Sequence, residues 1–372
     1  MVHAQLLLED GTLLEGEGCG APGIRYGEIV FSTGMVGYPE SLTDPSYKGH
    51  LLTMTYPLMG NYGVPRKDIA LHGIPLHFES DRIQVEGFIV SSVTRSNHWA
   101  SEMELDEWLK TEQIPGIQGI DTRMLVKHIR SGGVMMGALV VGEHMDTEKV
   151  LHTLASTSYD SQQFLKQVAP SHTISHEPPT WKKTVIVVDC GIKYGIVRAL
   201  LSQGFRVIRI PPTADPLTCA DKYTAQGVVF GNGPGNPALL TDLIDTARTV
   251  IEAGTPALGI CLGSQILALA DGGSVYKLPY GHRGVNKPVK DLQTQRAFVT
   301  TQNHGYAIQE DSLNDFSCTM INIDDGSVEG ISHSIHPVLA VQFHPEASPG
   351  PTDSRWVFHR FSQLMEGENC DC

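Results

Sequence analysis

In the second half of the chain, short apolar runs alternate with longer segments whose apolar residues recur at helical spacing. The runs at 185–188, 205–210 and 227–230 predict buried strands, because they are short, apolar and rich in β-branched residues. The segments at 196–203 and 238–252 predict helices, and each is followed closely by a glycine. This alternation predicts right-handed crossovers and a mostly parallel open sheet flanked by helices.

The first half of the chain lacks this regular alternation. Three apolar runs predict strands, over residues 5–8, 28–32 and 87–93. Helical spacing predicts helices at 102–112 and 121–131, the second with Asp121 or Thr122 as its N-cap and Gly132 as its stop. We therefore expect a mixed α/β domain in this half.

A polar stretch with three prolines separates the two patterns and predicts an interdomain linker. We place the N-terminal mixed α/β domain at 1–168, the linker at 169–182 and the second α/β domain at 183–372. A chain of 372 residues is long enough for two domains.

Composition and charge exclude several classes of protein. With 41% apolar and 18% charged residues, the chain is typical of a soluble globular protein. No apolar run approaches the roughly 18 residues that a spanning helix needs. Residues 1–5 have neither the charged start nor the apolar core of a signal peptide. The net charge of −14 argues against nucleic acid and anionic membranes as partners.

The cysteines indicate the compartment. Seven of them are scattered along the chain, which does not predict a disulfide framework in a protein of this size. We expect a reducing, cytoplasmic compartment, which an active thiol also requires. Cys370 and Cys372 end a polar tail, where we expect a frayed terminus rather than a metal site.

One cysteine occupies a position typical of a nucleophile. An apolar run at 255–260 predicts a strand, and 262–270 predicts a helix. Cys261 therefore stands on a sharp strand-to-helix turn between Gly259 and Gly263, which is the geometry of a nucleophile elbow. A helix N-terminus lowers the pKa of a thiol, so we expect a catalytic Cys261 rather than a buried structural cysteine.

A base and an orienting carboxylate lie near the C-terminus. The apolar run at 339–344 predicts a strand ending in His344, and Glu346 follows two residues later. Cysteine, imidazole and carboxylate together have the logic of a catalytic triad. Since ligand sites in such sheets form at the carboxyl ends of strands, Cys261 and His344 should converge there.

A third loop, at 231–237, also follows a predicted strand. No Gly-Lys-Ser/Thr follows its glycines, which excludes a phosphate-binding P-loop. We interpret it as part of an oxyanion hole, in which Gly233 or Gly235 supplies one N–H, because Pro234 cannot donate. The second N–H would come from Leu262, the residue after the nucleophile. A simple tight turn is the alternative.

Two other motifs predict no site. Residues 16–21 fit a loose dinucleotide fingerprint, but Pro22 and Gly23 follow where a helix is needed. His333 and His336 suggest a metal, yet no third ligand has suitable spacing. We therefore expect no metal and no cofactor on this chain.

Residues 259–265, Gly-Ile-Cys-Leu-Gly-Ser-Gln, followed by Gln-Phe-His-Pro-Glu at 342–346, resemble the class I, or triad, glutamine amidotransferases. The loop at 231–237 and Gln-Asn-His-Gly-Tyr at 302–306 fall in the order of that family. The resemblance covers residues 183–372. It implies that four residues of the second domain contact the substrate L-glutamine: Gln265, Asn303, Gly305 and Tyr306.

The N-terminal half discriminates among such proteins. Four of its segments resemble the small subunit of carbamoyl-phosphate synthetase, residues 31–40, 42–47, 55–63 and 116–123. This resemblance implies that Ser46 also contacts glutamine. It implies that glutamine is hydrolysed through a thioester on Cys261 and that ammonia passes to a large subunit. ATP, Mg²⁺ and bicarbonate would bind to that partner, in a heterodimer that serves arginine or pyrimidine biosynthesis.

Other functions stay open at this stage. The chain could donate ammonia for anthranilate, guanylate or cytidylate synthesis, although those amidotransferases lack this N-terminal half. It could be a stand-alone cysteine hydrolase on a similar sheet, acting on other amides without a partner. A non-catalytic regulatory subunit is the third alternative. The presence of Cys261, His344 and Glu346 argues against that alternative, since a binding protein does not need all three.

Overall fold

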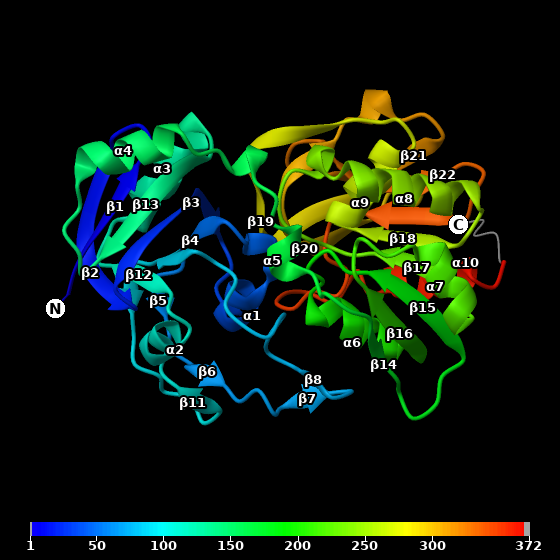
Figure 1. The fold of residues 1–372 in the computed structure, drawn as a ribbon, viewed down its shortest axis with the longest axis horizontal. Coiled ribbons are helices and arrows are strands. Elements are labelled where there is room, and N and C mark those ends of the chain that lie inside the picture. Colours follow the sequence, from blue (N-terminus) through cyan, green and yellow to red (C-terminus); the bar gives the residue numbers. More distant parts are fainter. Residues whose placement is uncertain (1, 368–372) are drawn as a thin grey trace. The chain divides into compact units, whose positions relative to one another are not determined.

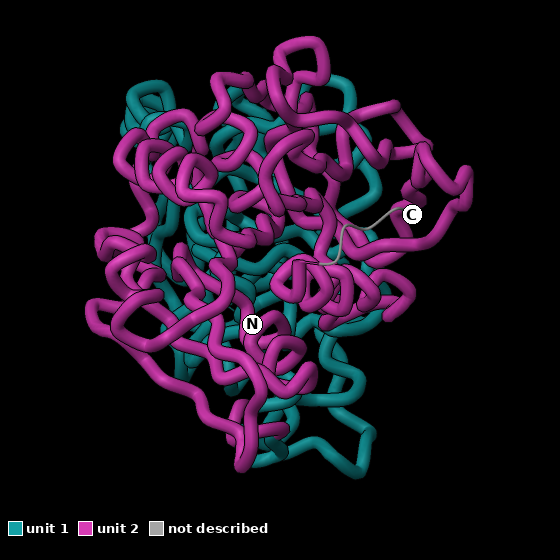
Figure 2. The backbone as a smooth tube through the Cα atoms, turned by 90° about the vertical axis from the view of Figure 1, so that its right-hand side faces the viewer, with its two compact units in different colours: residues 1–70, 75–162 teal, residues 71–74, 163–372 magenta. Residues whose placement is uncertain are grey.

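The computed structural model describes residues 2–367 and divides the chain into two compact units (Figures 1 and 2). The first unit comprises Met1–Ala70 and Pro75–Gln162, and the second comprises Leu71–Ile74 and Gln163–Cys372. The predicted frayed end with Cys370 and Cys372 lies outside the described residues. None of the helices within 2–367 has the length and apolar character to cross a bilayer.

The N-terminal unit is built on a closed barrel with the strand order β1-β13-β3-β4-β9-β12-β2. Buried apolar residues face each other across its long strands. For example, Leu6 of β1 lies opposite Leu139 of β13, and both side chains are buried. The barrel strands are β1 (Val2–Leu8), β2 (Leu13–Gly20), β3 (Gly23–Ser32), β4 (His50–Met54), β9 (Gly87–Ile89), β12 (Pro115–Gln118) and β13 (Met135–Val141).

Helices and short paired strands complete this unit, so the prediction of a mixed α/β domain is confirmed. The helices are α1 (Tyr38–Thr43), α2 (Leu105–Thr111), α3 (Thr122–Gly132) and α4 (Thr147–Ala155), with short turns η1 (Pro45–Tyr47) and η2 (Tyr159–Ser161). The short strands are β5 (Leu58–Met59), β6 (Val64–Pro65), β7 (Ala70–Leu71), β8 (Ile74–Pro75), β10 (Ser92–Val93) and β11 (Ser101–Met103).

Two predicted elements of this unit differ in the structure. The helix expected from residue 102 begins at Leu105, because β11 pairs with β6 over its first residues. The strand expected at 87–93 is two strands, since β9 belongs to the barrel and β10 pairs with β5. The N-cap prediction for α3 is confirmed, because the Asp121 side chain accepts a hydrogen bond from the Met124 N–H at 2.9 Å.

The second unit contains a 10-stranded sheet in the order β14-β16-β15-β17-β18-β23-β22-β21-β19-β20 (Figure 1). Its strands are β14 (Ile174–His176), β15 (Lys183–Val188), β16 (Phe205–Ile210), β17 (Gly227–Phe230), β18 (Ala257–Ile260), β19 (Val275–Asp291), β20 (Ala297–Ile308), β21 (Phe316–Asn322), β22 (Val328–His333) and β23 (Val338–Val341).

The predicted parallel strands form one side of this sheet, where β16, β15, β17, β18 and β23 pair in parallel. The other side is antiparallel, through β22, β21, β19 and β20. The alternation of strands and helices predicted only the parallel side, because the antiparallel strands follow one another without helices between them.

Helices cover both faces of the parallel strands. Along β15, Ile186 and Val188 pack in one apolar cluster with residues of α8 and α9, whereas Val185 and Val187 pack in another with residues of α6 and α10. This is the period-two alternation of a strand that is buried on both faces. The helices of this unit are α5 (Leu165–Val168), α6 (Tyr194–Ser202), α7 (Pro216–Tyr223), α8 (Thr241–Glu252), α9 (Leu262–Ala270) and α10 (Trp356–Leu364), with η3 (Pro237–Leu239) and η4 (Glu310–Ser312).

The segment expected to be a linker at 169–182 contains a strand. β14 pairs antiparallel with β16 at the edge of the sheet, and the second unit begins at Gln163. Three alternating residues in a polar, proline-containing stretch give too weak a pattern to predict a strand, because the edge of the sheet supplies the pairing.

Candidate active site

Cys261 lies between β18 and α9, on the turn that the sequence predicts. Its backbone has φ 54° and ψ −104°, a strained conformation for a residue with a Cβ. The Cys261 N–H donates to the Val341 carbonyl of β23 at 2.9 Å, which fixes the turn to the neighbouring strand. Cys261 therefore has the backbone of a nucleophile elbow.

The glycines on either side of the elbow allow α9 to pack closely on the sheet. A Cβ on Gly263 would lie 2.0 Å from the carbonyl oxygen of Phe230, and one on Gly259 would lie 2.8 Å from the carbonyl oxygen of Gly263. Neither position has room for a side chain. The two glycines thus hold the helix start against β17 and β18, where the thiol is presented.

His344 reaches the same end of the sheet by a different route from the one predicted. β23 ends at Val341, and His344 instead pairs with Thr301 in an isolated bridge, donating its N–H to the Thr301 carbonyl at 2.8 Å. The prediction that His344 ends the strand is therefore wrong by three residues. The apolar run continues through Phe343 because that side chain is buried in the core, and its burial does not require strand pairing.

His344 and Glu346 form a buried pair, in which Nδ1 of the ring lies 2.7 Å from Oε1 of the carboxylate. Burial lowers the pKa of His344, but the attraction of the Glu346 carboxylate, together with hydrogen bonding to Cys261 and Glu346, outweighs it, and the pKa rises well above its usual range. Burial likewise opposes ionisation of Glu346, but Lys193 and His344 together lower its pKa. The pair therefore favours imidazolium and carboxylate.

Lys193 is a member of this site that sequence analysis missed. Its side chain is 2% exposed, and Nζ lies 2.9 Å from Glu346 Oε1 and donates to the Ala347 carbonyl at 2.8 Å. The sequence offered one signal, because Lys193 follows the apolar strand β15 at its carboxyl end, where sites form. A lysine in a polar loop is usually exposed, however, so this signal was weak.

Two buried polar side chains hold Lys193 in place. The Asp189 carboxylate accepts hydrogen bonds from the N–H groups of Gly191 and Ile192 at 2.9 and 2.8 Å. The Asn232 side-chain oxygen accepts from the Lys193 N–H at 2.9 Å, and its amide nitrogen donates to the Gly191 carbonyl. The loop after β15 and the loop after β17 are thus hydrogen-bonded to each other at the Lys193 backbone.

The thiol lies beside the imidazole. A hydrogen-bonding interaction with the Cys261 side chain contributes to the raised pKa of His344, after the larger effects of burial, Glu346 and Lys193. The aligned hydrogen bond of Sγ is to the Asn303 carbonyl at 3.6 Å, while His344 Nε2 is buried without an aligned partner. Catalytic hydrogen bonds are often misaligned before substrate binds.

The glycine-rich loop reaches the elbow as predicted from its place in the sheet. A Cβ on Gly233 would lie 2.8 Å from the Leu262 side chain, so the two predicted oxyanion donors belong to touching segments. Leu262 is the first residue of α9, where an N–H has no acceptor within the helix. Gly235 has φ 97°, a conformation that favours glycine. Which of Gly233 and Gly235 donates stays a prediction.

The predicted glutamine-binding segment lies on β20 beside the elbow. Gln265 of α9 donates from its side-chain amide to the Tyr306 carbonyl at 2.9 Å and to Gln342 Oε1 at 3.0 Å. Gln265 therefore joins the elbow helix to β20 at Tyr306, and Asn303 and Gly305 lie on the same strand. Contact of these residues with glutamine stays a prediction, and so does that of Ser46, which lies in η1 of the N-terminal unit.

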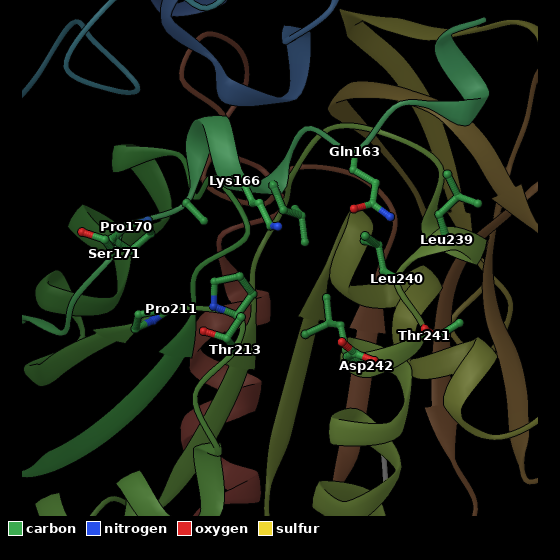
Figure 3. A pocket seen from close by; sticks show the side chains of 14 residues that line it. Gln163, Lys166, Pro170, Ser171, Pro211, Thr213, Leu239, Leu240, Thr241 and Asp242 are labelled. Atoms are coloured by element: carbon green, nitrogen blue, oxygen red, sulfur yellow. The ribbon is translucent and has the colours of Figure 1, made fainter.

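A cavity of about 390 Å³ lies elsewhere in the second unit (Figure 3). It is lined by the segments around Gln163, Lys166, Pro211 and Leu240, and none of the predicted catalytic or glutamine-binding residues lines it. We therefore place the candidate chemistry at Cys261 rather than in this cavity. The backbone of Cys261 is strained, and the charged side chains of His344 and Glu346 belong to the same site.

Comparison with known proteins agrees with both halves of the chain. Residues 6–139 match the family described as carbamoyl-phosphate synthase small chain, CPSase domain, and residues 186–364 match glutamine amidotransferase class-I. A carbamoyl phosphate synthase small chain of Pyrococcus furiosus is 56% identical, over 97% of this chain and 97% of its own. That of Sulfolobus acidocaldarius is 49% identical, over 97% and 96%. The chain therefore belongs to the family of carbamoyl-phosphate synthase small chains, with a class I glutamine amidotransferase domain in its second half.

Proposed function

We propose that this chain is the glutamine-hydrolysing subunit of carbamoyl-phosphate synthase and that Cys261 is its nucleophile. The observation that carries the assignment is the strained Cys261 elbow beside the buried His344–Glu346 pair. Family membership supports glutamine as the amide that is cleaved.

In the first half of the reaction, the Cys261 thiolate attacks the side-chain amide carbon of glutamine. The N–H of Leu262 and that of Gly233 or Gly235 stabilise the oxyanion of the tetrahedral intermediate. The carbon–nitrogen bond then breaks, and His344 donates a proton to the departing ammonia. A glutamyl thioester is left on Cys261, and His344 is left neutral.

In the second half, neutral His344 takes a proton from water, and the resulting hydroxide attacks the thioester carbon. The carbon–sulfur bond breaks, which releases glutamate and restores the Cys261 thiolate. Glu346 orients the imidazole through Nδ1 and stabilises its charged form. Lys193 holds Glu346 in position through its ion pair.

Ammonia would pass within a complex to the large subunit. Free ammonia is mostly protonated at neutral pH, and ammonium is not a nucleophile. Ammonia released into water would therefore be lost to the synthetic reaction. The large subunit would hold ATP, Mg²⁺ and bicarbonate in a heterodimer. We place this complex in the cytoplasm and in arginine or pyrimidine biosynthesis.

The test is glutamate release by the purified chain, with and without a carbamoyl-phosphate synthase large subunit and its substrates. Wild type is compared with Cys261→Ser, and Cys219→Ser serves as the control because Cys219 is a half-buried thiol on α7. We expect release that requires Cys261, survives Cys219→Ser and rises when the partner is added. Release indifferent to the partner would indicate another amidotransferase or a stand-alone hydrolase, and no release in any mixture would leave a binding role.

A further inference from the structure

A second group of chemically capable side chains lies in the antiparallel half of the sheet. His282 on β19, His304 on β20 and Glu329 on β22 are all buried, and one ligand atom from each lies within 4.8 Å of the others. Glu329 Oε1 is 3.8 Å from His282 Nδ1 and 3.9 Å from His304 Nε2. None of the three has a place in the proposed reaction.

Hydrogen bonds fix which nitrogen of each ring carries a lone pair. His304 Nδ1 lies 2.8 Å from the Tyr306 carbonyl, which only accepts, so Nδ1 carries the proton and Nε2 the lone pair. His282 Nε2 lies 2.9 Å from Asp325 Oδ2. Its other nitrogen, Nδ1, faces the amide nitrogen of Asn322, a donor, and therefore carries a lone pair. Both lone pairs are on the side of Glu329.

The cluster has more acceptors than hydrogens. The Asn322 amide nitrogen has two hydrogens but three acceptors within reach, Glu329 Oε1 at 2.9 Å, Gln302 Oε1 at 3.2 Å and His282 Nδ1 at 3.3 Å. In addition, His304 Nε2 and Glu329 Oε2 are buried without a hydrogen-bond partner. Buried acceptors without a partner are costly, so the group lacks a proton or a cation.

The other acidic and histidine-containing group of the described residues does not have this property. Asp271, Asp315 and His333 also lie close together. However, His333 Nδ1 accepts from the N–H groups of Ile335 and His336 at 3.1 Å each, which leaves the ring proton on Nε2. No lone pair of the neutral ring is then available to a metal. This agrees with the interpretation of residues 333–336 as a loop.

We propose that His282, His304 and Glu329 form a binding site for Zn²⁺. Two imidazole nitrogens and one carboxylate are a donor set that Zn²⁺ takes, with a fourth position for water. Tetrahedral bonds of about 2.0–2.1 Å separate ligands by about 3.3 Å, so the carboxylate-to-imidazole distances of 3.8 and 3.9 Å would close by roughly 0.5 Å.

The surroundings of the two rings support this proposal. A metal-bound histidine usually donates its other N–H to a carboxylate or a backbone carbonyl, which orients the ring. His282 has Asp325 in that role, and His304 has the Tyr306 carbonyl. Sequence spacing could not predict the site, because the three ligands come from three strands that the fold brings together.

A bound ion would join β19, β20 and β22 at His304, which lies between Asn303 and Tyr306 on β20. It would therefore stabilise the position of this part of β20 rather than take part in bond cleavage. This consequence rests on the proposed function, but zinc binding itself does not, so the two can fail separately.

The test is a zinc titration of the full chain, followed by metal analysis after dialysis and by the absorption spectrum of the Co²⁺ form. Cys219, Cys261, Cys318, Cys370 and Cys372 are replaced by serine throughout, because accessible thiols also bind zinc. We expect one bound ion per chain and a higher Tm in its presence. Glu329→Gln should weaken binding at least 10-fold. Asp325→Asn should weaken it by about 10- to 100-fold, as loss of a ring-orienting partner does.

Asp315→Asn is the matched control, because it removes an acid from the other group and should leave the affinity unchanged. Asp325 is near the surface, so its variant tests the site even where Glu329→Gln disturbs folding. Less than a tenth of an ion per chain, or equal affinity in wild type and both test variants, would overturn the zinc site. A proton on Glu329 would then satisfy the surplus acceptors.

Discussion

Lys193 Nζ lies 2.9 Å from Glu346 Oε1, and both side chains are almost completely buried. With an imidazolium on His344, these three groups carry a net charge of +1 in a buried place. A thiolate on Cys261 brings that sum to zero. Isolated buried charges are very costly, so this positive charge favours the negative charge that forms on the sulfur and on the oxyanion in the proposed reaction.

Replacement of Lys193 should damage both stability and catalysis. Lys193→Met leaves the buried Glu346 with only His344 as a cationic partner, and breaking a buried pair in this way costs about 3–5 kcal/mol. We expect a lower Tm and slower glutamate release, measured on the same preparation. Lys222→Met, at an exposed position of α7, is the control and should change neither quantity appreciably. Equal Tm values for Lys193→Met and wild type would contradict this account of the ion pair.

Removal of the Glu346 charge should move the pH profile of glutaminase activity. Burial lowers the pKa of His344 and Glu346 raises it, so Glu346→Gln should lower that pKa. If the imidazolium is required to protonate ammonia, the alkaline limb of kcat/KM shifts to lower pH in the variant. The measurement is a pH–rate profile of both proteins. An alkaline limb at the same pH in both would exclude His344 as its origin.

The same carboxylate should make stability depend on pH under acidic conditions. The pKa of Glu346 is lowered in the folded state, because Lys193 and His344 outweigh the effect of burial. A depressed pKa stabilises the folded state above the unfolded value, and that stability is lost as the pH falls towards the folded value of about 2.

Urea unfolding at pH 5 and at pH 3 measures this effect. Wild type should lose more free energy of unfolding between these two pH values than Glu346→Gln does. Glu107→Gln, at an exposed position of α2, should behave like wild type. A Glu346→Gln chain with the full acid sensitivity of wild type would show that other carboxylates cause it.

A side chain at Gly263 should force the elbow helix away from the sheet. The Cβ of Gly263→Ala would lie 2.0 Å from the Phe230 carbonyl oxygen, which is backbone and cannot swing aside. We expect a loss of about 1–3 kcal/mol in the free energy of unfolding and little glutaminase activity. Gly132→Ala in α3 is the control, because the atom nearest to its Cβ is the flexible end of the Met135 side chain at 3.4 Å. A Gly263→Ala chain as stable and active as wild type would refute the packing argument.

The parts of the fold predicted from sequence are those in which local pattern and tertiary structure agree. β17, β16 and α9 occur where their apolar runs and glycine boundaries predict them. Cys261 and His344 were predicted as site residues for the same reason, since each follows an apolar strand. The start of α2 was predicted wrongly because β11 forms by pairing with β6, and the sequence of one strand does not show its partner.

The remaining parts of the site depend on burial, which pattern alone does not give. Lys193 lies in a loop, so its sequence context predicts an exposed charge. In the structure, hydrogen bonds from the loop backbone to Asp189 and Asn232 fix the loop, and the Lys193 side chain is buried. The acceptor-rich group on β19, β20 and β22 is likewise a property of antiparallel pairing between distant strands. Neither could be recognised before the register of the sheet was known.

The pairing of β14 with β16 also protects the protein from self-association. An uncovered strand edge offers free N–H and C=O groups to another molecule and is a common origin of aggregation. Residues 174–176 occupy that edge in every copy of the chain. A truncated protein that starts at residue 183 would expose β16 and should precipitate on concentration, whereas one that starts at residue 163 keeps its own cover. The segment at 169–182, which the sequence predicts to be a linker, thus protects the edge of β16 from pairing with another molecule.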